Sequence, residues 1–270
     1  MFSRKNFRIF PVIAPLVGSA IAANSVTYDF ESSGSGDLFA GGGVTGWSQD
    51  TTNPSAFGQT FPLAYIAATD FGGGSSVSAH LGTQQSNTPD NADTTLTGDL
   101  SSLDPIYNML NVSFNMAVLD DSSDSYEGRD AFNIALTTAS GSQVATIGLA
   151  PKDGDNETWN VSVGVNGSTS TTPYQISANS AYSLYIASRD SVTDFRIGPA
   201  GGISESMGSF TAATSLNSVT GITFEHDPLS PVGTSAHTLA FDNVSVQIPE
   251  PSSSLLMVLS AGLIAIRRRR

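Results

Sequence analysis

The 270-residue sequence contains no cysteine and few basic residues. Without cysteine, disulfides, thiol nucleophiles and thiolate metal sites are excluded, so the folded chain depends on its core alone. Seven of the 11 basic residues lie in the first eight or the last four positions. Residues 23–248 therefore hold four basic residues and all 24 acidic residues but Glu250, an excess of 19 negative charges. This surface repels phosphates, so nucleic acid is a poor partner.

The stretch between the two ends also lacks any convincing helical period. Apolar and polar residues alternate at 110–118, 132–136, 161–165, 182–186 and 222–224, a period of two that predicts half-buried strands. Turn-forming residues separate these segments at 140–142, 152–155 and 166–168. Residues 32–60 and 70–95 are low in apolar content and are expected to be long loops with one or two short strands. The pattern predicts an all-β antiparallel sandwich or barrel.

The N-terminus predicts export. Basic residues occur among the first eight positions, an apolar stretch follows to Val17, and Ala20-Ile21-Ala22 is a small-x-small cleavage site. These features define a secretory signal peptide at residues 1–22, with a signal helix that the Sec translocon and signal peptidase would recognise. Cleavage is expected after Ala22, with Ala23 as a near equivalent, and an uncleaved signal anchor is the alternative.

The C-terminus has three parts in a fixed order. Pro249, Glu250 and Pro251 come first, an apolar run from 255 to 266 follows, and the chain ends in Arg267, Arg268, Arg269 and Arg270. The uncharged stretch 252–266 has 15 residues, whereas a spanning helix needs about 20. Terminal arginines are expected on the cytoplasmic side of a membrane.

This C-terminal arrangement, residues 249–270, resembles the PEP-CTERM sorting signal of Gram-negative bacteria. The resemblance implies a C-terminal transmembrane helix that anchors the exported protein transiently in the inner membrane. It also implies a partner, the membrane enzyme exosortase, which processes the chain near Pro249-Glu250-Pro251. The processed protein is then expected at the cell surface or in the extracellular matrix.

The first and last strands of the body carry a second resemblance. Residues 26–31 and 239–246 are similar to the opening and closing strands of jelly-roll domains of the carbohydrate-binding-module and legume-lectin-like type. Residues 23–248 are therefore expected to form one lectin-like jelly-roll β-sandwich. In the closing strand, apolar residues change parity between Phe241 and Val244, which requires a bulge near Asp242 and Asn243.

The jelly-roll resemblance implies a structural Ca²⁺ bound by Asp242 with Asp29 or Glu31. Calcium takes six to eight oxygen ligands, which an acidic exported domain can supply. The alternative is that Asp242 caps a turn or faces solvent. The acidic stretch 120–130 lacks the spacing of an EF-hand, which favours a solvated loop.

Catalytic patterns are weak. Glu225 and Asp227 would share one face of a strand, as paired glycosidase carboxylates do, but Pro228 follows and favours a strand end. His80 and His237 have no matching partners in the sequence. We therefore predict that the protein is not an enzyme and that no catalytic residue is present.

Trp47 follows a glycine-rich loop and could stack on a sugar, or it could pack in the core. Together these features predict a non-catalytic structural or glycan-binding protein, with extracellular polysaccharide as a candidate partner. The alternative is a divergent glycoside hydrolase or lyase, which requires two carboxyl groups about 5–9.5 Å apart.

Overall fold

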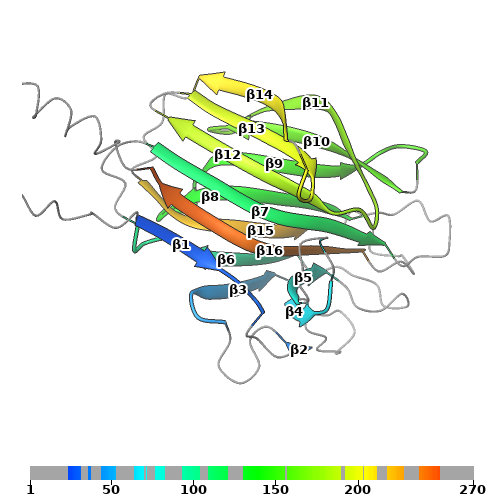
Figure 1. Ribbon diagram of the computed structural model, residues 1–270, viewed down its shortest axis with the longest axis horizontal. Coiled ribbons are helices and arrows are strands. Elements are labelled where there is room, and N and C mark those ends of the chain that lie inside the picture. Colours follow the sequence, from blue (N-terminus) through cyan, green and yellow to red (C-terminus); the bar gives the residue numbers. More distant parts are fainter. Residues whose placement is uncertain are drawn as a thin grey trace, which may run out of the picture.

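The chain forms two antiparallel β-sheets packed face to face (Figure 1). This all-β sandwich was predicted from the sequence. The computed structural model describes residues 24–31, 36–37, 44–52, 64–69, 71, 77–82, 93–103, 109–120, 130–155, 157–189, 192–202, 204–211, 218–227 and 237–249. The predicted signal helix and its cleavage residues, and the tail from Glu250 to Arg270, lie outside this set. Within it, no helix is long and apolar enough to cross a membrane.

The larger sheet has nine strands, with β16 near its centre. One side of β16 pairs with β7, and its other side pairs first with β5 and then with β1. The order along the sheet is β14-β13-β12-β7-β16-β5-β4-β2. The strands are β1 (Asn24–Tyr28), β2 (Gly36–Asp37), β4 (Ala64–Ala67), β5 (Ser78–Gly82), β7 (Met109–Asp120), β12 (Tyr182–Arg189), β13 (Val192–Pro199), β14 (Glu205–Thr211) and β16 (His237–Ile248).

The smaller sheet has seven strands in the order β11-β10-β9-β8-β15-β6-β3. Its hairpins use the turn residues that the sequence offers. Between β10 and β11, Asn166 and Gly167 have φ angles of 53° and 76°, as a two-residue hairpin turn with both residues left-handed requires. The strands are β3 (Trp47–Thr52), β6 (Asp93–Asp99), β8 (Ala131–Thr138), β9 (Gln143–Pro151), β10 (Thr158–Val165), β11 (Ser168–Ser177) and β15 (Val219–Asp227).

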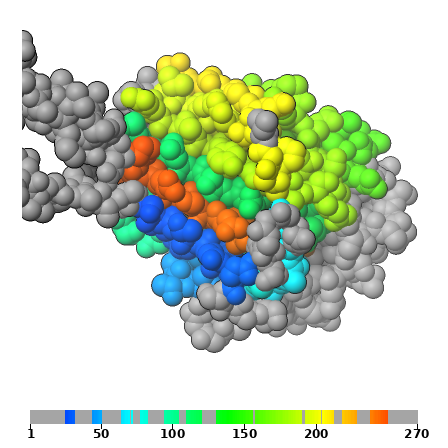
Figure 2. Space-filling view, viewed as in Figure 1, coloured from blue at the N-terminus to red at the C-terminus, as the bar shows by residue number. Residues whose placement is uncertain are grey.

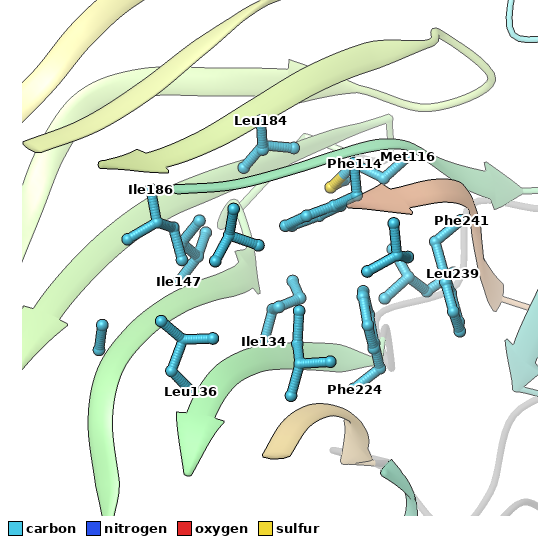
Figure 3. Close-up of a cluster of buried hydrophobic side chains, with 14 of the residues drawn as sticks. Phe114, Met116, Ile134, Leu136, Ile147, Leu184, Ile186, Phe224, Leu239 and Phe241 are labelled. Atoms are coloured by element: carbon cyan, nitrogen blue, oxygen red, sulfur yellow. The ribbon is translucent and has the colours of Figure 1, made fainter. Parts of the chain in front are cut away.

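The core lies between the two sheets, because alternate residues of each strand point inward. In Figure 3, Phe114, Met116 and Leu184 of the larger sheet face Ile134 and Phe224 of the smaller one. The rings of Phe224 and Phe241 stack across the interface with centroids 3.9 Å apart. With no disulfide available, this apolar layer is the main source of stability.

The bulge predicted in the closing strand is present. The β16–β7 register shifts between Asp242 and Ser245, and Asn243 has a φ of 53°. The shift lets Phe241 and Val244 both face the core although their parities differ. At the same point, the neighbour of β16 changes from β5 to β1.

Candidate functional site

Strand register aligns two rows of side chains on the outer face of the larger sheet. They point outward because the residues between them in the chain, such as Val112, Ile186 and Phe195, are buried. From β16 to β14, the first row is Gln247, Asn111, Ala187, Asp194 and Ser209, and the second is Ser245, Ser113, Tyr185, Arg196 and Ser206.

A shallow pocket of about 430 Å³ lies over these rows, and we call it the outer groove. Its volume falls within the range of known small-molecule sites. Figure 2 shows the face that carries it, with β16 in orange and β1 in blue. The lining residues are Asn111, Val112, Ser113, Tyr185, Ile186, Ala187, Asp194, Arg196, Ser204, Ser245 and Gln247.

Asp194 and Arg196 are the charged residues of the groove lining. Asp194 Oδ2 accepts the Arg196 Nε–H at 2.8 Å, while Oδ1 accepts the hydroxyls of Ser206 at 2.7 Å and Ser209 at 2.9 Å. Partial burial opposes ionisation of Asp194, but these hydrogen bonds and the charge of Arg196 outweigh it and lower the pKa of the carboxyl. The pair leaves the groove without net charge on a strongly acidic protein.

Tyr185 gives the groove an exposed aromatic ring. Its exposed fraction is 38%, and among the described residues only Val192, at 46%, is another large apolar side chain so exposed. The side chains of Asn111, Gln247, Ser113 and Ser245 line the same groove and carry amide and hydroxyl groups. An aromatic face beside hydrogen-bonding groups suits a ligand with both apolar faces and hydroxyls.

A second polar cluster is buried at the end of the sandwich where β16 begins. His226 Nε2 of β15 lies 3.0 Å from Asp130 Oδ2, and His237 Nδ1 of β16 lies 3.6 Å from the same oxygen. The backbone N–H of Asp130 also donates to His237 Nδ1 at 3.3 Å, and its carbonyl accepts Trp159 Nε1–H at 3.0 Å. Asp130 thereby connects both sheets.

Burial of Asp130 would by itself raise the pKa of its carboxyl. The hydrogen bond with His226 and the proximity of both imidazoles outweigh burial and hold the pKa below its usual value. The sequence did not reveal this cluster, because its members are about 10 to 100 residues apart and meet only through strand pairing. The three side chains are nearly inaccessible, which makes a structural role the simplest interpretation.

Trp47 lies in the core, which is the packing alternative stated for it above. Its exposed fraction is 8%, and its ring centroid is 5.0 Å from that of Tyr28 and 5.6 Å from that of Phe241. Its ring also contacts Phe30 and Phe224. Stacking on a sugar at this position would require the core to open.

The three residues predicted to bind calcium differ in environment. Asp29 is exposed and accepts the Glu31 backbone N–H at 2.8 Å, and Glu31 accepts the Val77 N–H at 3.4 Å. Asp242 is fully buried and accepts Asn243 Nδ2–H at 2.9 Å. Across the described ranges, no group of three or more His, Cys, Asp or Glu side chains could hold a metal. Calcium binding stays a prediction.

Glu225 and Asp227 lie at alternate positions near the end of β15. Glu225 accepts hydrogen bonds from Asn133 at 2.8 Å and from Gln143 at 3.3 Å, while Asp227 is exposed. His80 is buried, and its Nε2 contacts Thr69 Oγ1 at 2.7 Å. Burial lowers the pKa of His80 to about 4.

Comparison with known families identifies the end of the chain. Residues 247–270 match the model of the PEP-CTERM protein-sorting motif. This motif is a substrate signal for exosortase, and it indicates an exported protein that is anchored transiently in a membrane before processing. No curated protein sequence matches the chain.

A solved structure shares the β-sandwich fold of the body. The chain is similar to the CBM2 module of an evolved Dit protein from Lactobacillus casei BL23 phage J-1, with 15% identity and a TM-score of 0.51. The alignment covers 84% of this chain and 99% of the module. At this identity the likeness concerns the fold alone.

Two further structures are less similar. One is a carbohydrate esterase of the Shiga toxin-encoding bacteriophage phi24B, with 14% identity, a TM-score of 0.49, and coverage of 83% of this chain and 98% of the esterase. The other is basic winged bean lectin with Tn-antigen, with 11% identity, a TM-score of 0.48, and coverage of 84% and 100%.

Proposed function

We propose that this exported protein is processed by exosortase and then acts at the cell surface or in the extracellular matrix, where its sandwich binds a glycan without cleaving it. The observation that carries this proposal is the outer groove, a neutral polar surface with one exposed aromatic ring. Sugars present hydroxyl groups around an apolar ring face, and the groove offers partners for both.

The charge of the groove supports a glycan ligand with many hydroxyl groups. Asp194 is neutralised by Arg196, so a ligand meets no net repulsion there although the body carries a large excess of negative charge. The groove crosses strands β16, β7, β12 and β13, with Ser204 preceding β14. At about 4.8 Å between strands, these four strands span roughly 14 Å, which is room for an oligosaccharide.

The groove favours binding over hydrolysis. A glycosidase requires two carboxyl groups flanking the scissile bond, and the groove lining contains one, Asp194. Both oxygens of Asp194 already accept hydrogen bonds from Arg196, Ser206 and Ser209. A hydrolase or lyase would have to use other residues.

A glycan array tests the proposal, followed by calorimetry with the best oligosaccharide. Tyr185→Ala should weaken binding by a factor of about 2 to 12, because loss of an aromatic contact costs about 0.5–1.5 kcal/mol. Val192→Ala is the matched control, since Val192 is exposed on the same sheet but outside the groove. The oligosaccharide should be recovered intact after long incubation.

Absence of binding on the array would leave a purely structural role for the sandwich. Equal loss with Tyr185→Ala and Val192→Ala would place the ligand elsewhere. Release of shortened sugars by the wild-type protein would contradict the non-catalytic proposal and favour the hydrolase or lyase.

Sorting is tested separately. Replacing Pro249, Glu250 and Pro251 by alanine should leave the tail on the protein in a host that contains exosortase, as seen by the mass of the chain. Export should continue, because the predicted signal peptide is unchanged. Normal processing of this variant would contradict the role of the motif.

A further inference from the structure

The two rows of the outer groove continue past it onto the first strand. Ser25 of β1 lies opposite Gln247, and Thr27 lies opposite Ser245. Both side chains are exposed, because Val26 between them turns inward and packs against the core. Figure 2 shows β1 in blue beside β16 in orange on this face. On the β16 side, the polar rows therefore include one strand more than the groove.

The rows also continue at their other end, onto β14. Asp194 lies opposite Ser209, and Arg196 lies opposite Ser206. Both serine hydroxyls donate to Asp194 Oδ1, and each hydroxyl oxygen can still accept a hydrogen bond from a ligand. The two rows thus cross the six strands β1, β16, β7, β12, β13 and β14, and we call this set of side chains the polar ladder.

A covered region of the same outer face sets the direction in which a ligand can lie. Ala117 of β7 and Ala240 of β16 also point outward, because their chain neighbours belong to the core, but both are buried in a cluster with Phe71. Ala117 is four residues from Ser113 along β7, or roughly 13 Å. A long ligand lying along the strands would run into this covered region, whereas one lying across them follows the polar ladder.

The spacing of the ladder fits an extended sugar chain. Six strands at about 4.8 Å from one to the next span roughly 24 Å. An extended chain of pyranose sugars advances by about one strand spacing per sugar, so the ladder has room for about five sugars and the groove alone for about three. Rows that run past the groove on both sides suit the interior of a long chain rather than its end.

The charges along the ladder favour an uncharged chain. Asp194 is offset by Arg196, and Asp29, two residues beyond Thr27, is exposed. The body as a whole carries an excess of 19 negative charges. A polyanionic chain lying across six strands would meet this field at every sugar, so repulsion opposes its binding.

We propose that the polar ladder binds an internal stretch of an uncharged polysaccharide of the cellulose, mannan or xylan type, lying across the six strands from β1 to β14. This inference rests on the proposed function and names the substrate class of the same site. Equatorial linkages keep these chains extended, so successive sugars stay on the sheet, whereas an axially linked chain coils away from it. Tyr185 contacts one sugar face near the middle, and the rows bond the hydroxyls on either side.

Chain length gives the first test. Calorimetry with the full chain measures the Kd of cello-, manno- and xylo-oligosaccharides of three to six sugars. In the series that binds, affinity should rise at least about tenfold from three sugars to about five and then level off, because the added sugars reach β1 and β14. A hexasaccharide whose reducing end has been converted to the alditol should bind equally well, because an internal site does not contact the chain end.

A double variant tests the contribution of β1. Ser25→Ala with Thr27→Val removes both exposed hydroxyls and keeps a β-branched residue in the strand. It should weaken hexasaccharide binding by about threefold to tenfold, through lost hydrogen bonds, and leave trisaccharide binding within about twofold of wild type. Unchanged trisaccharide binding also shows that the variant is folded. Thr171→Val, at an exposed position of β11 in the smaller sheet, is the matched control and should change neither value.

Charge selectivity is measured by competition. Polymannuronate is an acidic chain with the same linkage as mannan, so it has the extended shape but carries a carboxylate on every sugar. It should not displace a bound hexasaccharide, because the acidic body repels it. Displacement by polymannuronate would contradict the preference for an uncharged chain.

The ladder and the proposed function fail in different ways. Equal affinity from three sugars upward, loss of binding on reduction of the chain end, or hexasaccharide binding unchanged by the double variant would overturn the ladder and leave glycan binding in the groove intact. The same holds if the array finds a ligand but none of the three series binds. Absence of any glycan ligand on the array would refute the proposed function itself.

Discussion

Asp130 uses three polar groups to join strands of both sheets. Its carboxylate faces His226, its N–H donates to His237, and its carbonyl accepts from Trp159. Asp130→Ala should lower the free energy of unfolding by about 1–3 kcal/mol, because the buried imidazoles of His226 and His237 lose their carboxylate partner. Urea unfolding at pH 7 measures the loss. Asp153→Ala, on an exposed turn, should stay within about 0.5 kcal/mol of wild type, and an equally mild Asp130→Ala would contradict the structural role.

His80 should make the fold sensitive to mild acid. Its pKa is lowered by burial from 6.5 to about 4 in the folded protein, so the neutral ring is favoured there. The contribution of His80 to stability is complete above pH 6.5 and is lost as the pH falls toward 4. The full loss amounts to about 3 kcal/mol. Urea unfolding at several pH values should show this slope, and His80→Gln should flatten it.

A further loss of stability is expected below pH 4, and its source is Asp130. The pKa of Asp130 is lowered in the folded protein, so its contribution is present above the unfolded value of about 3.9 and disappears as the pH falls through the folded value. His80→Gln should therefore keep this later loss. If His80→Gln kept the wild-type dependence of unfolding free energy on pH between 6.5 and 4, His80 would not be its cause.

At the scale of elements, the sequence predicted strands where apolar alternation is strong. β7 and β16 are the clearest cases. The change in apolar alternation near Asp242 and Asn243 also predicted the bulge in β16, which the register shift confirms. β11 was not recognised, because it is an exposed edge strand rich in serine and threonine that owes its conformation to pairing with β10. β14, the edge of the other sheet, escaped for the same reason.

The outer groove could not be predicted because it depends on strand order. Asn111, Tyr185, Arg196 and Ser245 are up to 134 residues apart in the chain. They meet because β7 lies between β16 and β12, and local alternation carries no information about such neighbours. The outward parity of Asn111 and Ser245 was readable, but not that they share a face with Tyr185. Trp47 shows that local sequence can also leave burial undecided. The glycine-rich segment before it was compatible with an exposed ring and with a buried one.

The bulge in β16 is an element whose shape can be tested directly. Asn243 has a φ of 53°, in the left-handed region that asparagine and glycine tolerate. Asn243→Val should lower the free energy of unfolding by about 1–3 kcal/mol, because a β-branched residue is strained there. Asn243→Gly removes only the side chain and its bond to Asp242, so it should cost less. Urea unfolding compares the two, and the reverse order would contradict a strained bulge.

At the scale of the whole molecule, the net charge of the body contrasts with the neutral outer groove. The body carries an excess of 19 negative charges without a disulfide to resist their repulsion. Within the groove lining, Asp194 is offset by Arg196, so the neutral patch stands out from its surroundings. Under the proposed function, the domain would meet its ligand where electrostatic repulsion is least.

Self-repulsion predicts that salt stabilises the protein. Raising NaCl from about 10 to 150 mM shortens the screening length from roughly 30 to 8 Å, so the melting temperature should rise. A scan in CaCl₂ at matched ionic strength separates screening from a bound ion, because an ion that binds only the folded state adds its own stabilisation. An added rise that Asp242→Asn removes would confirm the calcium prediction, whereas coincident curves would show it wrong. A melting temperature that falls with NaCl would contradict the repulsion argument, since screening can only relieve repulsion between like charges.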